Sequence, residues 1–162
     1  ADSFLVNHSR AYTIAAVVSW IEFWVELFFA PGLKGIFLNI MLGGVLVFAG
    51  QCCRTLAMHT AGTNFHHIVQ TRRDSRHRLV TTGIYAIFRH PSYFGWFWWS
   101  VGTQVLLGNP ICVVAYTAAS WRFFADRIPF EEAALQNMYP KEYPGYCKRT
   151  MVGIPLLDRT TA

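Results

Sequence analysis

Residues 88–100 read FRHPSYFGWFWWS, and this stretch decides the fold. Its first half is polar and contains Arg89, His90 and Tyr93, whereas its second half is dominated by tryptophan and phenylalanine. Pro91 is suited to the first turn of a helix, because its missing N–H would have no intrahelical acceptor there. The stretch therefore predicts a helix that begins in water and continues into an apolar medium.

The composition indicates that this medium is a lipid bilayer. Of the 162 residues, 53% are hydrophobic and 16% aromatic, and the mean hydropathy is +0.27, which is too apolar for an ordinary water-soluble domain. The net charge of +5 does not indicate nucleic acid, because the sequence has no recognition motif and no basic stripe. We therefore expect the bilayer, and no nucleic acid, as a partner.

Four apolar stretches predict membrane crossings, at about residues 12–30, 36–58, 92–107 and 110–125. A helix needs about 20 residues to cross a bilayer, and the first two stretches have this length. The last two are shorter, at roughly 24 Å each, and they form a helical hairpin around Gly108–Asn109–Pro110 that is extended at its mouth. The predicted fold is an all-α, polytopic membrane helical bundle in a single domain, 1–162.

Two carboxylates lie inside the first predicted crossing. Glu22 and Glu26 are four residues apart and share one face of the helix. Because carboxylates are costly in hydrocarbon, we expect them to face other helices or water, either as a packing surface or as part of a proton or ion path. In the second crossing, small residues would let another helix approach closely: Gly43, Gly44, Ala49 and Gly50.

The remaining segments, about 59–91 and 126–162, are polar and basic. If both are cytosolic, every Lys and Arg except Lys34 lies on that side, as the positive-inside rule predicts. We expect the 126–162 tail to be a short helix followed by proline-broken loops. A cytosolic cofactor pocket formed by the 59–91 loop and this tail completes the predicted fold.

The start of the third crossing is the first candidate site. Free amides of the first helical turn, including that of Ser92, would face the cytosolic mouth and form an anion site, to which His90 and Tyr93 add side-chain donors. The alternative is a plain helix start with an aromatic belt at the membrane surface.

The second candidate site contains Arg127, Glu131 and Glu132. At a membrane mouth, Arg127 would bind a carboxylate in bidentate fashion. The alternative is an exposed Arg127–Glu131 pair of about 0.3 to 0.5 kcal/mol. Pro129 lies between them and is expected to disturb the helix. No metal site is expected, because the histidines lack the spacing of metal ligands.

Four stretches of this chain resemble the isoprenylcysteine carboxyl methyltransferase family, and they occur in the family's order. They are FHHIVQ (65–70), HRLVTTGIYAIFRHPSYFGWFWWSVGTQ (77–104), NPICVVAYTAASWRFFADRI (109–128) and EEAALQNMYPKEYPGYCKRTMVGIPLL (131–157). Phospholipid methyltransferases and sterol reductases share only the R-H-P-x-Y helix start and a later glutamate pair. The resemblance extends over most of the chain.

The resemblance implies methyl transfer from S-adenosylmethionine to the carboxylate of a C-terminal prenylcysteine. The substrates would be CaaX-processed proteins such as small GTPases, and the enzyme would lie in the endoplasmic reticulum membrane with its active site facing the cytosol. Animal members have further transmembrane helices before the point where this chain begins, so we expect these helices to be missing here. The alternatives are a methyltransferase of phospholipids or other lipids, and a membrane scaffold without enzymatic activity.

The resemblance also assigns the site residues. Arg127 would face the substrate carboxylate. The cofactor pocket would be built from the residues that match the family's motifs: Gln70, His77, Arg78, Leu79, Val80, Tyr85, His90, Pro91, Ser92, Tyr93 and Glu131.

Overall fold

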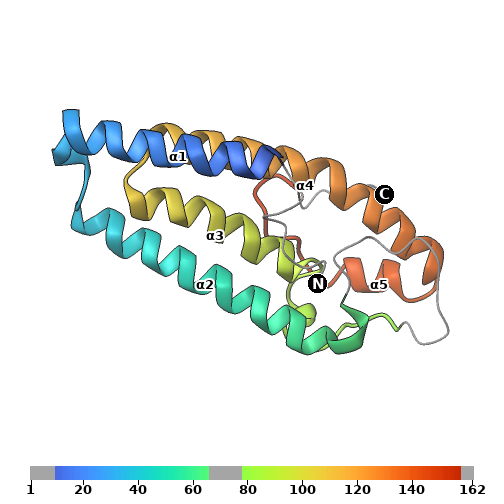
Figure 1. Cartoon of the computed structure of the whole chain (residues 1–162). Helices are drawn as coiled ribbons and strands as arrows, with labels where there is room; N and C mark the ends of the chain where they lie inside the picture. Colours follow the sequence, from blue (N-terminus) through green and yellow to red (C-terminus); the bar gives the residue numbers. More distant parts are fainter. Residues whose placement is uncertain (1–9, 66–77, 158–162) are drawn as a thin grey trace. The chain divides into compact units, whose positions relative to one another are not determined.

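The computed structural model describes residues 10–65 and 78–157, and all regular elements in these ranges are helical. The α-helices are α1 (Arg10–Phe29), α2 (Phe37–Ala61), α3 (Pro91–Leu107), α4 (Pro110–Met138) and α5 (Tyr143–Cys147) (Figure 1). Short 3₁₀ turns lie at Pro31–Leu33, Gly62–Asn64 and Gly83–Ala86. The predicted all-α class is confirmed.

The chain divides into two compact units, each of which takes parts of α2, α3 and α4. The first unit comprises Ala1–Ala49 and Trp98–Ser120, and the second unit comprises Gly50–Phe97 and Trp121–Ala162. The first unit contains α1 and the turn between α3 and α4, and the second contains α5 and the start of α3.

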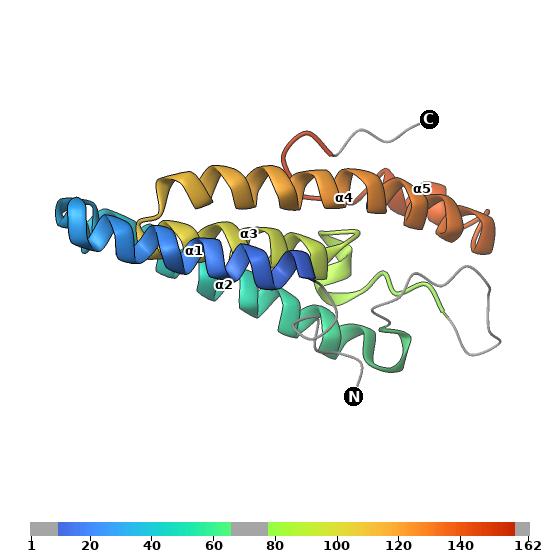
Figure 2. The ribbon, with the colours of Figure 1, turned by 45° about the horizontal axis from the view of Figure 1, so that its top comes forward.

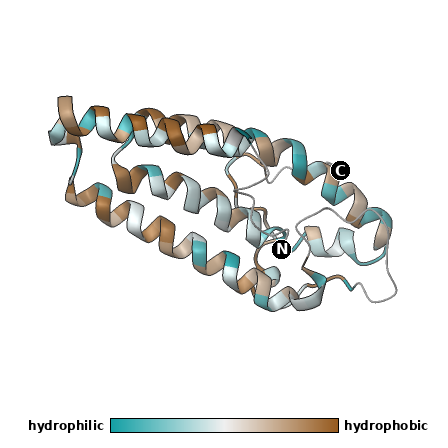
Figure 3. Ribbon diagram, viewed as in Figure 1, coloured by the Kyte–Doolittle hydropathy of each residue, from teal (hydrophilic) through white to brown (hydrophobic). Residues whose placement is uncertain are grey.

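Within residues 10–65 and 78–157, two helical stretches are long and apolar enough to cross a membrane, Tyr12–Phe29 and Phe37–Asn64. Only 11% and 17% of their residues are buried, whereas a core helix of a soluble protein would be mostly buried. Figure 3 shows apolar residues along α1 and along the first half of α2. Large side chains on these helices point outward, including Trp20 and Phe28 on α1 and Phe37 on α2. Such surfaces suit contact with lipid.

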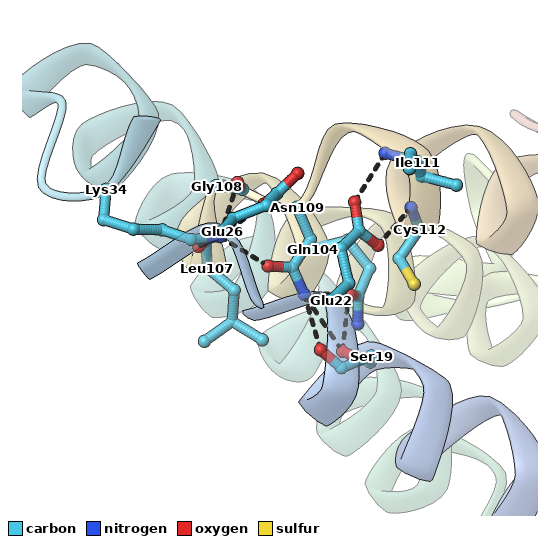
Figure 4. A network of polar contacts seen from close by, with 10 residues as sticks. All are labelled: Ser19, Glu22, Glu26, Lys34, Gln104, Leu107, Gly108, Asn109, Ile111 and Cys112. Atoms are coloured by element: carbon cyan, nitrogen blue, oxygen red, sulfur yellow. Dashed lines mark hydrogen bonds and ion pairs between the residues drawn. The ribbon is translucent and has the colours of Figure 1, made fainter. Parts of the chain in front are cut away.

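A buried polar network joins α1 to the α3–α4 turn in the first unit (Figure 4). The Glu22 carboxylate accepts hydrogen bonds from the amides of Ile111 (2.7 Å) and Cys112 (2.8 Å), and so caps the start of α4. The Asn109 side chain donates to the Ser19 carbonyl oxygen at 3.0 Å. Glu22 therefore faces another helix, as predicted.

Lys34 holds the other end of the same network. Its Nζ forms an ion pair with Glu26 at 2.7 Å and donates to Oδ1 of Asn109 and to the Gly108 carbonyl, both at 2.8 Å. A longer bond of 3.1 Å reaches the Leu107 carbonyl. The Glu26 carboxylate neutralises the charge of Lys34, and three further oxygens accept its hydrogen bonds. A charged side chain is therefore tolerated beside the α3–α4 turn.

Close approach of α2 and α3 depends on glycine at selected positions. A Cβ on Gly43 would lie 2.4 Å from the Leu106 amide nitrogen, whereas a Cβ on Gly44 would meet no atom within 4 Å. In the second unit, a Cβ on Gly95 would lie 2.5 Å from the Gly50 carbonyl oxygen. The predicted close packing is confirmed for Gly43 and Gly50, but Gly44 faces open space.

Helix α4 differs from the sequence prediction. It continues without a break to Met138, with Pro129 inside it, whereas we expected a crossing near 110–125 followed by a separate short helix. An interior proline removes one hydrogen bond of the helix and its ring crowds the carbonyl four residues earlier, but the helix is not interrupted at Pro129. Arg127 and Glu131 consequently lie on one continuous helix.

The residues after α4 fold back against it (Figures 1 and 2). Tyr139, Tyr143, Tyr146 and Cys147 form a buried cluster against Leu135 and Met138 of α4 and Leu79. Beyond α5, Met151 pairs with Phe88 in a bridge: Arg89 N–H donates to the Met151 carbonyl at 2.8 Å, and Met151 N–H to the Ile87 carbonyl at 3.0 Å. This bridge fastens the tail to the segment that starts α3.

Candidate active site

The start of α3 places His90 and Tyr93 side by side in the second unit. The His90 carbonyl accepts the first helical hydrogen bonds, from the amides of Tyr93 and Phe94, each at 3.0 Å. The His90 and Tyr93 rings are stacked, with centroids 5.4 Å apart and an angle of 7° between planes. His90 is only 5% exposed. One turn of helix therefore fixes both side chains.

Helix α4 brings Arg127 and Glu131 to the same place. The Tyr93 hydroxyl donates to Oε2 of Glu131 at 2.5 Å, and Nε of Arg127 donates to the Tyr93 oxygen at 2.7 Å. The sequence left open a direct Arg127–Glu131 pair, but here both residues bind the phenol of Tyr93. Tyr93 thus connects a cation and an anion from the facing helix.

Aromatic rings surround the Arg127 guanidinium. Its carbon lies 5.5 Å from the Tyr93 ring centroid and 5.7 Å from that of Phe123. Phe124 packs against Tyr93 at 5.0 Å and against Trp96 at 5.7 Å. A guanidinium in such surroundings gains from cation–π contact and attracts a further anion more strongly than it would in open water.

The structure adds a pairing that the sequence did not predict, between Arg89 and Glu132. The side chain of Arg89, 3% exposed, donates through Nε to Oε1 of Glu132 at 2.8 Å. Its NH1 group donates to the carbonyls of Cys147 (3.2 Å) and Thr150 (2.5 Å). The available signals were adjacency alone, because Arg89 precedes His90 and Glu132 follows Glu131.

Glu132 is ionised in this arrangement. Burial raises the pKa of its carboxyl, but hydrogen bonds and charge from His90 and Arg89 outweigh burial, and the pKa is lowered below its ordinary value. Nε2 of His90 lies 3.4 Å from Oε1 of Glu132, and Nδ1 lies 3.9 Å from Oε1 of Glu131. The imidazole is therefore bracketed by two carboxylates, one beside each ring nitrogen.

Tyr85, in the 3₁₀ turn Gly83–Ala86, approaches the same group. Burial raises the pKa of its phenol to about 12, and the negative charge of Glu131 adds to the shift. Its carbonyl accepts a hydrogen bond from the Tyr146 hydroxyl at 2.7 Å. Tyr146, a member of the buried tyrosine cluster, thus binds the 3₁₀ turn that contains Tyr85.

The other predicted cofactor residues are more scattered. Pro91 and Ser92 form the first turn of α3, and Leu79 packs against the tyrosine cluster. The backbone N–H of Arg78 donates to Oδ1 of Asn64 at 3.1 Å, and Val80 is half-buried. Gln70 and His77 lie outside the described residues.

Comparison with known proteins identifies the family of this chain. The model of the isoprenylcysteine carboxyl methyltransferase family matches residues 41–137. Protein-S-isoprenylcysteine O-methyltransferase of Tribolium castaneum is 50% identical over 157 residues, covering 97% of this chain and 56% of the relative. The Homo sapiens protein of that name is 52% identical (96% and 55% covered), and the Saccharomyces cerevisiae protein is 46% identical (97% and 68%).

A solved structure of the eukaryotic intramembrane Ras methyltransferase of this family superposes with a TM-score of 0.93. Its sequence is 50% identical, and the match covers 97% of this chain and 56% of that one. The fold is therefore that of an intramembrane helical protein. The chain belongs to the isoprenylcysteine carboxyl methyltransferase family. It spans little more than half the length of the Tribolium and human relatives.

Proposed function

We propose that this chain transfers a methyl group from S-adenosylmethionine to the carboxylate of a C-terminal prenylcysteine and so forms a methyl ester. The observation that carries the proposal is the position of Arg127, whose guanidinium lies between aromatic rings beside Tyr93 and Glu131. Arg127 lies where helix α4 changes from apolar to polar residues, and a cation there suits a substrate with an anionic head and an apolar tail.

The residues present fit the cofactor by the chemistry of their donors and acceptors. In the first turn of α3, Pro91 has no N–H and the amides of Tyr93 and Phe94 donate to His90, so the amide of Ser92 is the one that suits the carboxylate of the cofactor's methionine part. The Glu131 carboxylate, 24% exposed, suits its ammonium group. When bound, S-adenosylmethionine supplies a sulfonium methyl, whose transfer to a carboxylate oxygen breaks the carbon–sulfur bond and leaves that electron pair on sulfur.

No residue has to remove a proton in this reaction, because a carboxylate is already ionised at neutral pH. The task of Arg127 is to orient one carboxylate oxygen toward the methyl group. The task of Phe123, Phe124 and Trp96 is to exclude water, which would weaken that interaction. Because the ester product is neutral, its attraction to Arg127 is lost once the reaction is complete, and this favours release.

For the substrate and the location, we propose CaaX-processed proteins, such as small GTPases, and the endoplasmic reticulum membrane with the site toward the cytosol. The distribution of Lys and Arg in the sequence supports this orientation, since only Lys34 lies on the opposite side. Methylation of a phospholipid amine is less well supported, because an amine substrate needs proton removal and makes no use of Arg127.

The test is transfer of labelled methyl from S-adenosylmethionine to N-acetyl-S-farnesylcysteine by the chain in lipid nanodiscs. The methyl ester of the same compound is the control, since its carboxylate is blocked. We expect label in the free acid only. Label in phosphatidylethanolamine instead, or binding of neither S-adenosylmethionine nor S-adenosylhomocysteine by folded protein, would contradict the proposal.

A further inference from the structure

The two ring nitrogens of His90 face different carboxylates, and these carboxylates have different partners. Oε1 of Glu132, 3.4 Å from Nε2, also receives the 2.8 Å hydrogen bond from Arg89. Oε1 of Glu131, 3.9 Å from Nδ1, belongs to a carboxylate whose other oxygen accepts from Tyr93. Glu132 is therefore hydrogen-bonded to the buried guanidinium of Arg89, and Glu131 is hydrogen-bonded to the phenol of Tyr93.

When the imidazole of His90 carries a single N–H, the closer carboxylate favours the proton on the nitrogen beside it. With the proton on Nε2 and directed at Glu132, Nδ1 presents a lone pair toward Oε1 of Glu131. Two acceptors 3.9 Å apart do not attract each other, but a donor cation can lie about 2.8 to 3.0 Å from both. The arrangement thus leaves a place for an N–H cation between Nδ1 and Glu131.

We propose that Glu132, fixed by Arg89, is a positioning residue that sets the His90 tautomer, so that Nδ1 and Glu131 together bind the ammonium group of the cofactor. This inference rests on the proposed function and adds to it how the cofactor's ammonium group is bound. The sequence suggested that His90 donates to the cofactor's carboxylate, whereas this geometry makes Nδ1 an acceptor. The cofactor's carboxylate is left to the amide of Ser92 in the first turn of α3.

The position of Arg89 explains why Glu132 can perform this role. Arg89 reaches Glu132 from the segment that begins α3, and its NH1 group is bound by two carbonyls of the tail, those of Cys147 and Thr150. An arginine held at three points cannot follow the carboxylate if it rotates. The orientation of Oε1 is therefore imposed by the tail as well as by α4.

The test measures the ratio of two binding affinities rather than the rate of methyl transfer. S-adenosylhomocysteine and its desamino analogue, which lacks only the amino group, are titrated into the chain in nanodiscs by isothermal calorimetry. We expect the parent protein to prefer S-adenosylhomocysteine by about tenfold or more, since a hydrogen-bonded charge is removed from the analogue. In Glu132→Met the preference should fall to about one, because Nδ1 is no longer fixed as an acceptor.

Two further variants separate positioning from folding. Glu132→Gln keeps a carbonyl oxygen for Arg89 and His90 and should retain most of the preference. The double variant Arg89→Met/Glu132→Met removes both buried charges, which is better tolerated than removing one, and should show no preference. Glu142→Gln, an exposed glutamate at the start of α5, should match the parent protein. Because the preference is a ratio measured on one sample, a smaller folded fraction does not change it.

A spectroscopic readout checks the tautomer directly. The ¹⁵N shifts of the His90 ring, assigned by their loss in His90→Gln, should show a proton on Nε2 only in the ligand-free parent protein. A proton on Nδ1, or on both nitrogens, would overturn the proposal.

The remaining outcomes distinguish this proposal from the proposed function. If both affinities fall in Glu132→Met while their ratio is kept, Glu132 is only structural and the positioning role is wrong, although the methyltransferase function stands. If the parent protein binds both compounds equally, the ammonium site is wrong and the function again stands. If the folded parent protein binds neither compound, both proposals fail.

Discussion

In the first unit, the Glu22 carboxylate receives two backbone amides at the start of α4, whereas in the second unit the carboxylates of Glu131 and Glu132 receive side chains. Backbone amides do not titrate and cannot turn away, so Glu22 has a fixed structural partner. The partners of the second pair are a phenol, an imidazole and a guanidinium, whose hydrogen bonds can be exchanged for those of a ligand. We therefore expect the kind of partner, rather than burial alone, to distinguish a functional carboxylate from a structural one.

Replacement of Arg127 by alanine should have the largest effect on methyl transfer, because it removes the cation from the hydrogen-bonded group of Arg127, Tyr93 and Glu131. We expect methyl transfer to N-acetyl-S-farnesylcysteine to fall by about 10² to 10³, because the group that orients the reacting anion is lost. Calorimetric titration should show S-adenosylhomocysteine binding nearly unchanged. An equally large loss of that binding would contradict the role of Arg127 in holding the substrate.

Arg122→Ala is the matched control on the same helix. Arg122 pairs only with Asp126 among the contacts described, and its side chain is 77% exposed. An exposed pair of this kind contributes about 0.3 to 0.5 kcal/mol. The variant should therefore transfer methyl groups at the parent rate.

Replacement of Glu22 by alanine should break the first unit's network and leave the chemistry intact. Two buried amides would lose their acceptor, at a cost of about 1–3 kcal/mol each in the free energy of unfolding. The thermal unfolding midpoint in detergent should fall, while turnover per folded molecule stays the same. A lowered turnover with an unchanged midpoint would mean that Glu22 takes part in function, as in the proton path considered from the sequence.

Adjacent glycines of α2 offer a smaller and well-controlled perturbation. Gly43→Ala should lower the free energy of unfolding by about 1–3 kcal/mol, because the new Cβ would meet the backbone of Leu106. Gly44→Ala should instead raise it by about 0.5–1 kcal/mol, since alanine is the better helix former and the site is open. Equal effects of the two substitutions on the unfolding midpoint would contradict the packing of α2 against α3.

The smallest effect at neutral pH should come from Tyr85→Phe. Because the pKa of the Tyr85 phenol is raised to about 12, its stabilising contribution is fully present below the unfolded value near 10. That contribution is lost as the pH rises through 12. The parent protein should lose stability between pH 10 and 12 more steeply than Tyr85→Phe, as followed by unfolding midpoints. Parallel profiles would show that Glu131 and burial do not act on this phenol.

Much of the fold follows from the sequence, because span length and charge asymmetry are properties of composition. The end of α4 was less predictable. The change from apolar to polar residues at Asp126 and the proline at 129 suggested a boundary, yet the helix continues to Met138. A change from apolar to polar residues indicates where a chain meets water, but it does not indicate where a helix ends. The hydropathy of the sequence therefore could not show that α4 continues beyond its apolar part.

The candidate site was predicted in part. Family motifs supplied His90, Tyr93, Arg127 and Glu131, and the structure brings these together. The motifs also contain Arg89 and Glu132, but they did not predict that these residues, 43 positions apart, form an ion pair. Linear spacing reveals partners within one helix, whereas partners on two helices depend on the rotation of each about its axis.

The hydrogen bonds from Arg89 to the carbonyls of Cys147 and Thr150 have a consequence for biosynthesis. Thr150, which binds the Arg89 guanidinium, is made 61 residues after it, and chain synthesis proceeds at about 5–20 residues per second. For roughly 3–12 s, the start of α3 is therefore present in the nascent protein without the partner that fixes Glu132. A polypeptide terminated before Cys147 would therefore retain helices α1 to α4 and lack the two carbonyls that hold the Arg89 guanidinium.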